Sequence, residues 1–137
     1  MDNRYPMYVT KHAMESLVDK VKLPAPHPFS QDWEYEVADS ARTAEFLHAY
    51  DHYNLDIEEK FALMIIIISS LDEAMHLGQT EDNLAHLVKQ YLTHDIHIHM
   101  NTVNYWAMSD EEDLEDCFYI TPFMREILND ISKGSSL

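Results

Sequence analysis

Glycine, cysteine and basic residues are scarce in this sequence, and each scarcity narrows the possible functions. The 137 residues include two glycines, which excludes a Gly-rich phosphate loop or a dinucleotide-binding fold. The single cysteine, Cys117, excludes an internal disulfide framework and suits a reducing compartment. Nine Lys and Arg against 25 Asp and Glu give a formal net charge of −16, which disfavours binding to nucleic acid or to an anionic membrane surface.

Long hydrophobic runs are also missing. The longest, FALMIIII at residues 61–68, is far too short to span a bilayer. The first residues lack the basic start and apolar stretch of a signal peptide, so we expect a cytoplasmic protein. Hydrophobic residues still make up 46% of the chain, which is enough for the buried core of one domain.

The spacing of the apolar residues predicts an all-α protein, because they recur at helical intervals and seldom alternate at period two. Around the apolar FALMIIII segment, which we place in a central helix, we predict a single-domain bundle of five or six helices over residues 1–132. Residues 133–137 are expected to form a flexible tail. The expected helices follow Thr10, run from Ser30 to about Tyr53, from Asp56 to Gly78 and from Thr80 to about His94, cover residues 102–108, and begin again at Thr121.

The segment THDIHIHM, residues 93–100, has two interpretations. As a strand it would project Asp95, His97 and His99 to one side as three ligands of a catalytic zinc or iron ion, with His94 as a further candidate. As the end of one helix and the junction to the next, it would leave His97 and His99 facing solvent or capping a helix. The chain lacks HExxH and paired Glu-x-x-His motifs, so we favour the junction and predict no cofactor and no catalytic residues.

The run SDEEDLEDC, residues 109–117, is the most acidic part of the chain. Its carboxylates could dock lysines and arginines of a basic protein partner, and the aromatic pair just before it could anchor such an interface. The alternative is a solvated loop between two helices. The candidate partner-binding residues are Asp110, Glu111, Glu112, Asp113, Glu115, Asp116, Tyr105 and Trp106.

The second half of the chain resembles a known family. The stretches ALMIIIISSLDEA, LVKQYLTHDIHIHMNTVNYWAM and EDLEDCFYITPFMREI are similar to parts of the small acidic helical immunity proteins of bacterial toxin–immunity systems. The hydrophobic helix, the Tyr105-Trp106 pair and CFYITPFMRE carry this resemblance. It implies stoichiometric inhibition without catalytic residues, in which an acidic face blocks the basic active site of a cognate toxin, often a nuclease.

Two other functions stay open at the level of sequence. A small metal-dependent enzyme would use Asp95, His97 and His99 as ligands. A regulatory or scaffold domain would bind another protein through a groove between helices. Metal content that is lost on His97→Ala would favour the enzyme, whereas identification of a partner separates the scaffold from the toxin inhibitor.

Overall fold

The chain is all-helical in the computed structural model, which describes residues 3–79 and 82–135. Within these residues there is no strand, and seven α-helices form rather than five or six. Two short 3₁₀ helices accompany them. In chain order the elements are α1 (Lys11–Lys20), α2 (Trp33–Glu36), η1 (Ser40–Arg42), α3 (Thr43–His52), α4 (Ile57–His76), α5 (Asp82–His94), α6 (Ile96–Ala107), η2 (Leu114–Asp116) and α7 (Thr121–Ser135).

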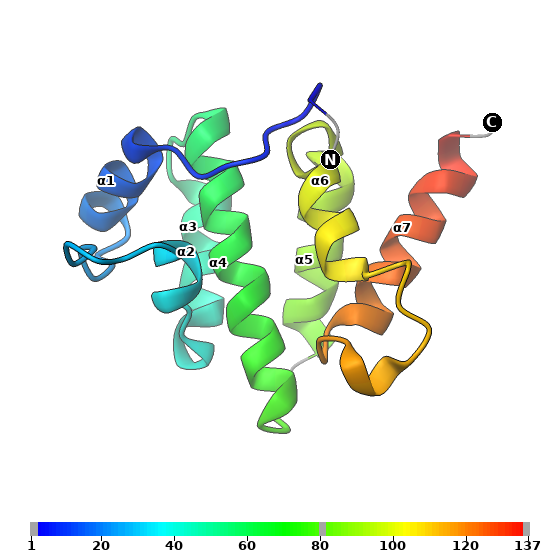
Figure 1. The fold of residues 1–137 in the computed structure, drawn as a ribbon. Coiled ribbons are helices and arrows are strands. Elements are labelled where there is room, and N and C mark those ends of the chain that lie inside the picture. The colour runs from blue at the N-terminus through cyan, green and yellow to red at the C-terminus, as the bar shows by residue number, and fades with distance from the viewer. Residues whose placement is uncertain (1–2, 80–81, 136–137) are drawn as a thin grey trace.

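Helix α4 separates the first three helices from the last three, as Figure 1 shows. It packs against α1, α2, α3 and α6, while α7 packs against α5 and α6. All eight residues 61–68 of α4 are buried, including the four consecutive isoleucines. This run is too apolar for a surface helix, and the burial of its side chains outweighs the low helix propensity of β-branched residues.

Local sequence sets both ends of α4. The Asp56 side chain accepts a hydrogen bond from the Glu59 backbone N–H, and the Glu59 side chain accepts one from the Asp56 backbone N–H, which completes the predicted capping box. At the other end Gly78 has a φ of +69°, the left-handed conformation that suits glycine, as predicted. The predicted cap of α1 is also present, since Thr10 Oγ1 accepts a hydrogen bond from the Ala13 N–H.

Glu59 also joins α1 to α4. Its Oε2 accepts hydrogen bonds from Ser16 Oγ at 2.6 Å and from Lys20 Nζ at 2.7 Å. Burial works against ionisation of this side chain, but the hydrogen bonds from Lys20 and Ser16 hold the pKa of Glu59 below its ordinary value. The buried carboxylate is therefore fully paired within the helix interface.

The helix expected from Ser30 to Tyr53 is wrong as a single element, because the structure divides it into α2, η1 and α3. The break lies at Asp39, whose Oδ1 accepts a hydrogen bond from the Ala41 N–H and so caps η1. The Asp39 N–H donates to Ser70 Oγ in α4, 31 residues away, and so is not available to an intrahelical bond. This division raises the number of helices above the expected six.

The end of the chain also differs from expectation. Helix α7 continues through Ser135, three residues into the stretch expected to be a flexible tail, and the last two residues lie outside the described part of the chain. The predicted start of a helix at Thr80 lies outside it as well.

Residues 3–10 form an N-terminal strap that crosses from α6 to the start of α1, at the upper edge of Figure 1. The Asn101 side-chain amide in α6 donates hydrogen bonds to the backbone oxygens of Tyr5 at 3.4 Å and Pro6 at 3.2 Å. The strap therefore connects the two halves of the protein outside α4.

Candidate functional site

The acidic loop, residues 109–117, connects α6 to α7 and is held by one arginine. Helix α6 ends at Ala107, and its capping residue Met108 has a φ of +44° and turns the chain sharply. Arg125 in α7 donates from Nε to the Ala107 oxygen at 2.7 Å, and from one terminal nitrogen to the oxygens of Met108 at 2.6 Å and Glu111 at 2.7 Å. The guanidinium thus fixes the loop by its backbone and leaves the loop's carboxylates uncompensated.

The carboxylates of the acidic loop have two kinds of role. Glu111 Oε1 accepts a hydrogen bond from the Asp113 N–H, and Asp113 Oδ1 accepts one from the Glu115 N–H, so these two side chains shape the loop. Among the described residues the other four carboxylates make no ion pair and lie on exposed residues. They are Asp110, Glu112, Glu115 and Asp116.

We expect Arg125→Met to destabilise the protein by about 2 kcal/mol, since charge-assisted hydrogen bonds to three carbonyls are lost. Amide hydrogen exchange in residues 109–117 should rise more than exchange in α4. Lys89→Met is the matched control, because it removes a surface cation that pairs with the exposed Asp130 carboxylate. If the two substitutions raise amide hydrogen exchange in the acidic loop equally, Arg125 does not hold the loop as proposed.

The two aromatic residues predicted as anchors occupy different environments. Tyr105 is 44% exposed, but Trp106 is only 3% exposed and belongs to the core. The Trp106 ring lies 4.3 Å from the Phe118 ring and 6.2 Å from the Tyr35 ring, measured between centroids. Tyr105 can therefore contact a partner directly, whereas Trp106 supports the surface from beneath.

Sequence reasoning missed three residues on this surface. Tyr35 in α2 reaches the predicted pair, with its ring centroid 6.4 Å from that of Tyr105. Leu114 is 54% exposed inside the acidic loop, and Tyr119, which directly follows Phe118, is 59% exposed. A large apolar residue within a charged run is a detectable sequence pattern for Leu114, but only tertiary structure brings Tyr35 here.

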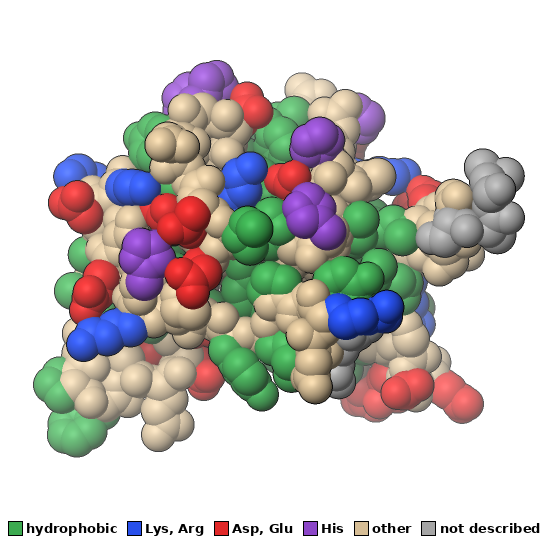
Figure 2. Space-filling model, turned by 90° about the horizontal axis from the view of Figure 1, so that it is seen from above, with side chains coloured by type: hydrophobic (Ala, Val, Ile, Leu, Met, Phe, Trp, Pro, Cys, Tyr) green, Lys and Arg blue, Asp and Glu red, His purple; other side chains and the backbone are tan. Residues whose placement is uncertain are grey.

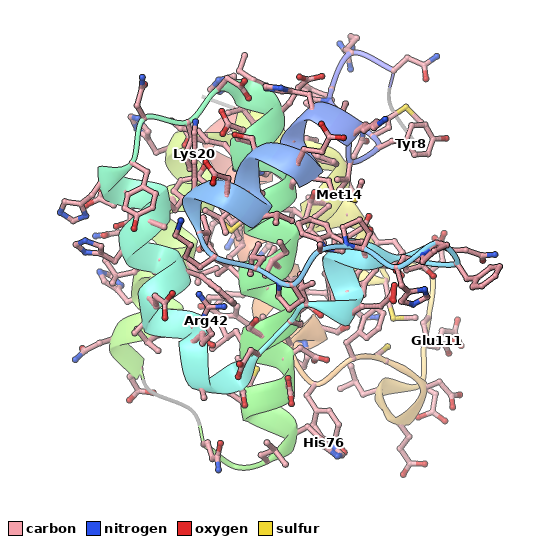
Figure 3. All side chains as sticks on the ribbon, turned by 90° about the vertical axis from the view of Figure 1, so that its left-hand side faces the viewer. Tyr8, Met14, Lys20, Arg42, His76 and Glu111 are labelled. Carbon is pink, nitrogen blue, oxygen red and sulfur yellow. The ribbon has the colours of Figure 1, made fainter. Side chains whose placement is uncertain are left out.

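Cavities surround Tyr35 on this side of the protein. One, of about 90 Å³, lies between α4 and α6 and is lined by Tyr35, Tyr105 and Trp106 among others. A second, of about 550 Å³, lies between the N-terminal strap and residues 30–35. A third, of about 440 Å³, lies beside Tyr119 and His76. Figure 3 shows that Tyr8 in the strap and Glu111 in the acidic loop project from the same side of the protein.

We call this side the aromatic–acidic face and define it by Tyr35, Tyr105, Leu114, Tyr119 and the acidic loop. Burial and the neighbouring Tyr105 hydroxyl raise the pKa of Tyr35, so its phenol stays neutral. Figure 2 looks down on the strap side of the molecule and not on this face; hydrophobic side chains gather across its middle, with acidic side chains to the left and at the lower right. The aromatic–acidic face itself combines the exposed Tyr105, Leu114 and Tyr119 with the exposed carboxylates of the loop. Apolar area beside uncompensated negative charge is a composition typical of protein interfaces.

The three candidate metal ligands of the histidine segment do not converge. The segment is helical, with Asp95 at the cap of α6, so His99 follows Asp95 by one turn and His97 points elsewhere and is exposed. The Tyr50 hydroxyl donates to Asp95 Oδ2 at 2.6 Å and accepts from His99 Nε2 at 2.7 Å. Asp95 and His99 therefore form a buried network with Tyr50, and His99 does not face solvent as expected.

Burial lowers the pKa of His99 from 6.5 to about 3, so this imidazole is neutral in the folded protein. The unfolded chain takes up a proton at this position below pH 6.5, and folding then becomes less favourable as pH falls towards about 3. We expect a stability loss approaching about 1.4 kcal/mol per pH unit from this residue alone. Urea titrations between pH 7 and pH 4 should show a smaller slope for His99→Gln than for the natural protein, and equal slopes would contradict the assignment.

One other group of side chains could hold a metal ion. Among the described residues, only His12, Asp56 and Glu58 place three ligand atoms within 4.8 Å of one another, and all three are exposed. His12 Nε2 lies 2.8 Å from Asp56 Oδ2, and this hydrogen bond raises the pKa of His12. Asp56 also caps the positive end of α4, where the helix dipole disfavours a cation. We therefore interpret His12 and Asp56 as an ion pair between α1 and the start of α4, and we do not assign a metal site to this group.

The chain has no match among protein-family models, curated proteins or solved structures. In the part of the chain that the structure describes, every helix is too short or too polar to cross a membrane.

Proposed function

We propose that this protein is a non-catalytic, acidic immunity protein that binds and neutralises a basic toxin, such as a nuclease, in the bacterial cytoplasm. One observation carries the proposal. The acidic loop presents four uncompensated carboxylates and the exposed Leu114 on a backbone held by Arg125, and the exposed Tyr105 and Tyr119 flank it in the chain.

The physical properties of the aromatic–acidic face suit inhibition of a basic enzyme. Uncompensated negative charge accelerates encounter with a basic surface. A loop that is already ordered loses little conformational entropy on binding, so more of the contact energy contributes to affinity. Exposed aromatic residues surrounded by polar groups supply the anchors that dominate many interfaces. The buried hydrogen bonds of Asp95 and His99 with Tyr50, and the separate position of His97, weigh against the metal-dependent enzyme.

Site-specific photo-crosslinking tests this function. A photo-reactive phenylalanine replaces Tyr105 on the aromatic–acidic face or, as a control, Tyr53, which is 43% exposed at the end of α3. In cells of the source organism, position 105 should capture one basic protein that position 53 does not. Expression of that protein should be toxic, and co-expression of the natural chain should remove the toxicity.

Three outcomes would count against the proposal. Equal capture at both positions would place the interface elsewhere. A captured protein that is acidic would contradict the electrostatic argument. A basic but harmless protein would replace toxin inhibition with a regulatory or scaffold role for the same face.

A further inference from the structure

The cavity between α4 and α6 has properties that the acidic loop does not explain. Its volume is about 90 Å³, and it opens on the aromatic–acidic face. The side chains that line it include Met7 of the N-terminal strap, Tyr35 of α2, Phe61 and Ile65 of α4, and Thr102 and Tyr105 of α6. Among the residues that the structure describes, no charged side chain lines the cavity. A charged occupant would therefore lose its hydration without gaining an ion pair, which is unfavourable.

Thr102 is the unusual member of the lining. The residue is 5% exposed, and its Oγ1 has no hydrogen-bond partner among the described residues. Buried hydroxyls are nearly always hydrogen-bonded, so the lining contains an unused hydrogen-bonding group that an occupant with a polar tip would satisfy. A threonine in a helix populates two rotamers, and rotation about its Cα–Cβ bond exchanges the methyl and hydroxyl groups. The hydroxyl can thus turn towards an occupant of the cavity.

The volume limits the size of the occupant. A dry cavity of about 150 Å³ accepts benzene, which has six heavy atoms. By proportion, 90 Å³ accepts about four heavy atoms, with some more at the open mouth. An aromatic ring is too large, whereas the side chains of threonine, asparagine, glutamine and methionine fit.

We propose that this cavity is a specificity pocket that receives one uncharged side chain with a hydrogen-bonding tip from a segment of the basic partner. The inference rests on the proposed function, because the acidic loop beside the pocket selects a basic segment by charge. The larger cavity along the strap shares Met7, Tyr35 and Ile65 with the pocket, which provides a continuous path for the rest of that segment. Charge on the loop then guides encounter, and the pocket selects among basic partners.

Small analogues of side chains test the pocket without the partner. Protein labelled with ¹³C at isoleucine methyl groups is titrated with propanamide, the analogue of glutamine, with propylammonium as the charged analogue and with toluene as the aromatic one. Propanamide should shift the Ile65 methyl resonance saturably at millimolar concentration and leave that of Ile67, which does not line the pocket, unchanged. Propylammonium or toluene binding as tightly as propanamide would overturn the assignment.

Two matched valine substitutions separate binding from structure. Thr102→Val should weaken propanamide binding about tenfold, yet leave the free protein equally or more stable, because the hydroxyl that it removes has no partner. Thr121→Val should do the opposite, since Thr121 Oγ1 donates to the Trp106 oxygen at 2.8 Å. Unchanged propanamide affinity in Thr102→Val would overturn the role of the hydroxyl.

The two proposals fail in different ways. If propanamide binds but no basic protein is crosslinked at position 105, the pocket does accept an uncharged polar group, and its assignment to a basic partner is overturned. A basic toxin crosslinked at position 105, with no propanamide binding and with equal toxin affinity for Thr102→Val, would uphold the proposed function and overturn the pocket.

Discussion

Replacing Asp95 with alanine should lower the free energy of unfolding by about 3 kcal/mol, because it removes one partner from a buried polar network. Asp95 Oδ2 accepts the Tyr50 hydroxyl at 2.6 Å and lies 3.8 Å from Lys60 Nζ. Without it, the buried Tyr50 hydroxyl loses its acceptor, and the ammonium group of the partly exposed Lys60 loses its ion-pair partner. The network also joins three helices, since Tyr50 lies in α3, Lys60 in α4 and His99 in α6.

Urea and thermal denaturation followed by circular dichroism would measure this loss, which corresponds to a fall in melting temperature of about 10 °C for a domain of this size. Asp110→Ala is the control, because it removes an aspartate from an exposed position of the acidic loop. If both substitutions change stability equally, the network is not the stabilising feature that its geometry indicates. Tyr50→Phe, which removes the bridging hydroxyl alone, should lie between the natural protein and Asp95→Ala.

Neutralising the four uncompensated carboxylates of the acidic loop should weaken binding to the basic partner by about 30-fold at low salt, from roughly 0.5 kcal/mol for each exposed charge. The combined variant is Asp110→Asn, Glu112→Gln, Glu115→Gln and Asp116→Asn. Most of the loss should appear in the association rate, and affinity should depend less on salt than in the natural protein. Stability of the free protein should be equal or higher, because like charges within one loop repel each other.

A second variant distinguishes local charge from net charge. Both variants remove four negative charges, so each changes the formal net charge from −16 to −12. The control places the same number of substitutions on other exposed acids, namely Glu15→Gln, Asp19→Asn, Asp51→Asn and Glu126→Gln. The association rate constant with the partner identified by crosslinking is measured by stopped flow over a range of salt concentrations. It should fall strongly in the loop variant and weakly in the control. Equal responses would mean that overall charge, and not the loop, attracts the partner.

The helical class and several helix ends could be predicted because they depend on nearby residues. Thr10, the Asp56 capping box and Gly78 each act within four residues of the helix end that they define. The division at Asp39 could not be predicted in the same way. It depends on Ser70, which is distant in sequence and becomes a neighbour only after α4 has packed.

The candidate site shows the same limit. Composition identifies the acidic run, but the hydrogen bonds by which Arg125 holds it depend on the packing of α7 against α6. Sequence alone predicts the same anchoring role for Tyr105 and Trp106. Successive residues of a helix face different directions, however, so Tyr105 is exposed and Trp106 is buried. His99 is buried for a similar reason, since its helical register places it opposite Tyr50, whereas period-two spacing would have placed it beside His97.

The N-terminal strap bears on how long the native state persists. Its hydrogen bonds with Asn101 involve Tyr5 and Pro6, which precede Asn101 by 96 and 95 residues. Closing so long a loop of chain is entropically costly until both halves of the protein have assembled. A contact that forms after the folding transition state contributes little to the folding rate, and its free energy appears instead as slower unfolding. We therefore expect the strap to slow unfolding, and so to lengthen the lifetime of the folded protein, without accelerating folding.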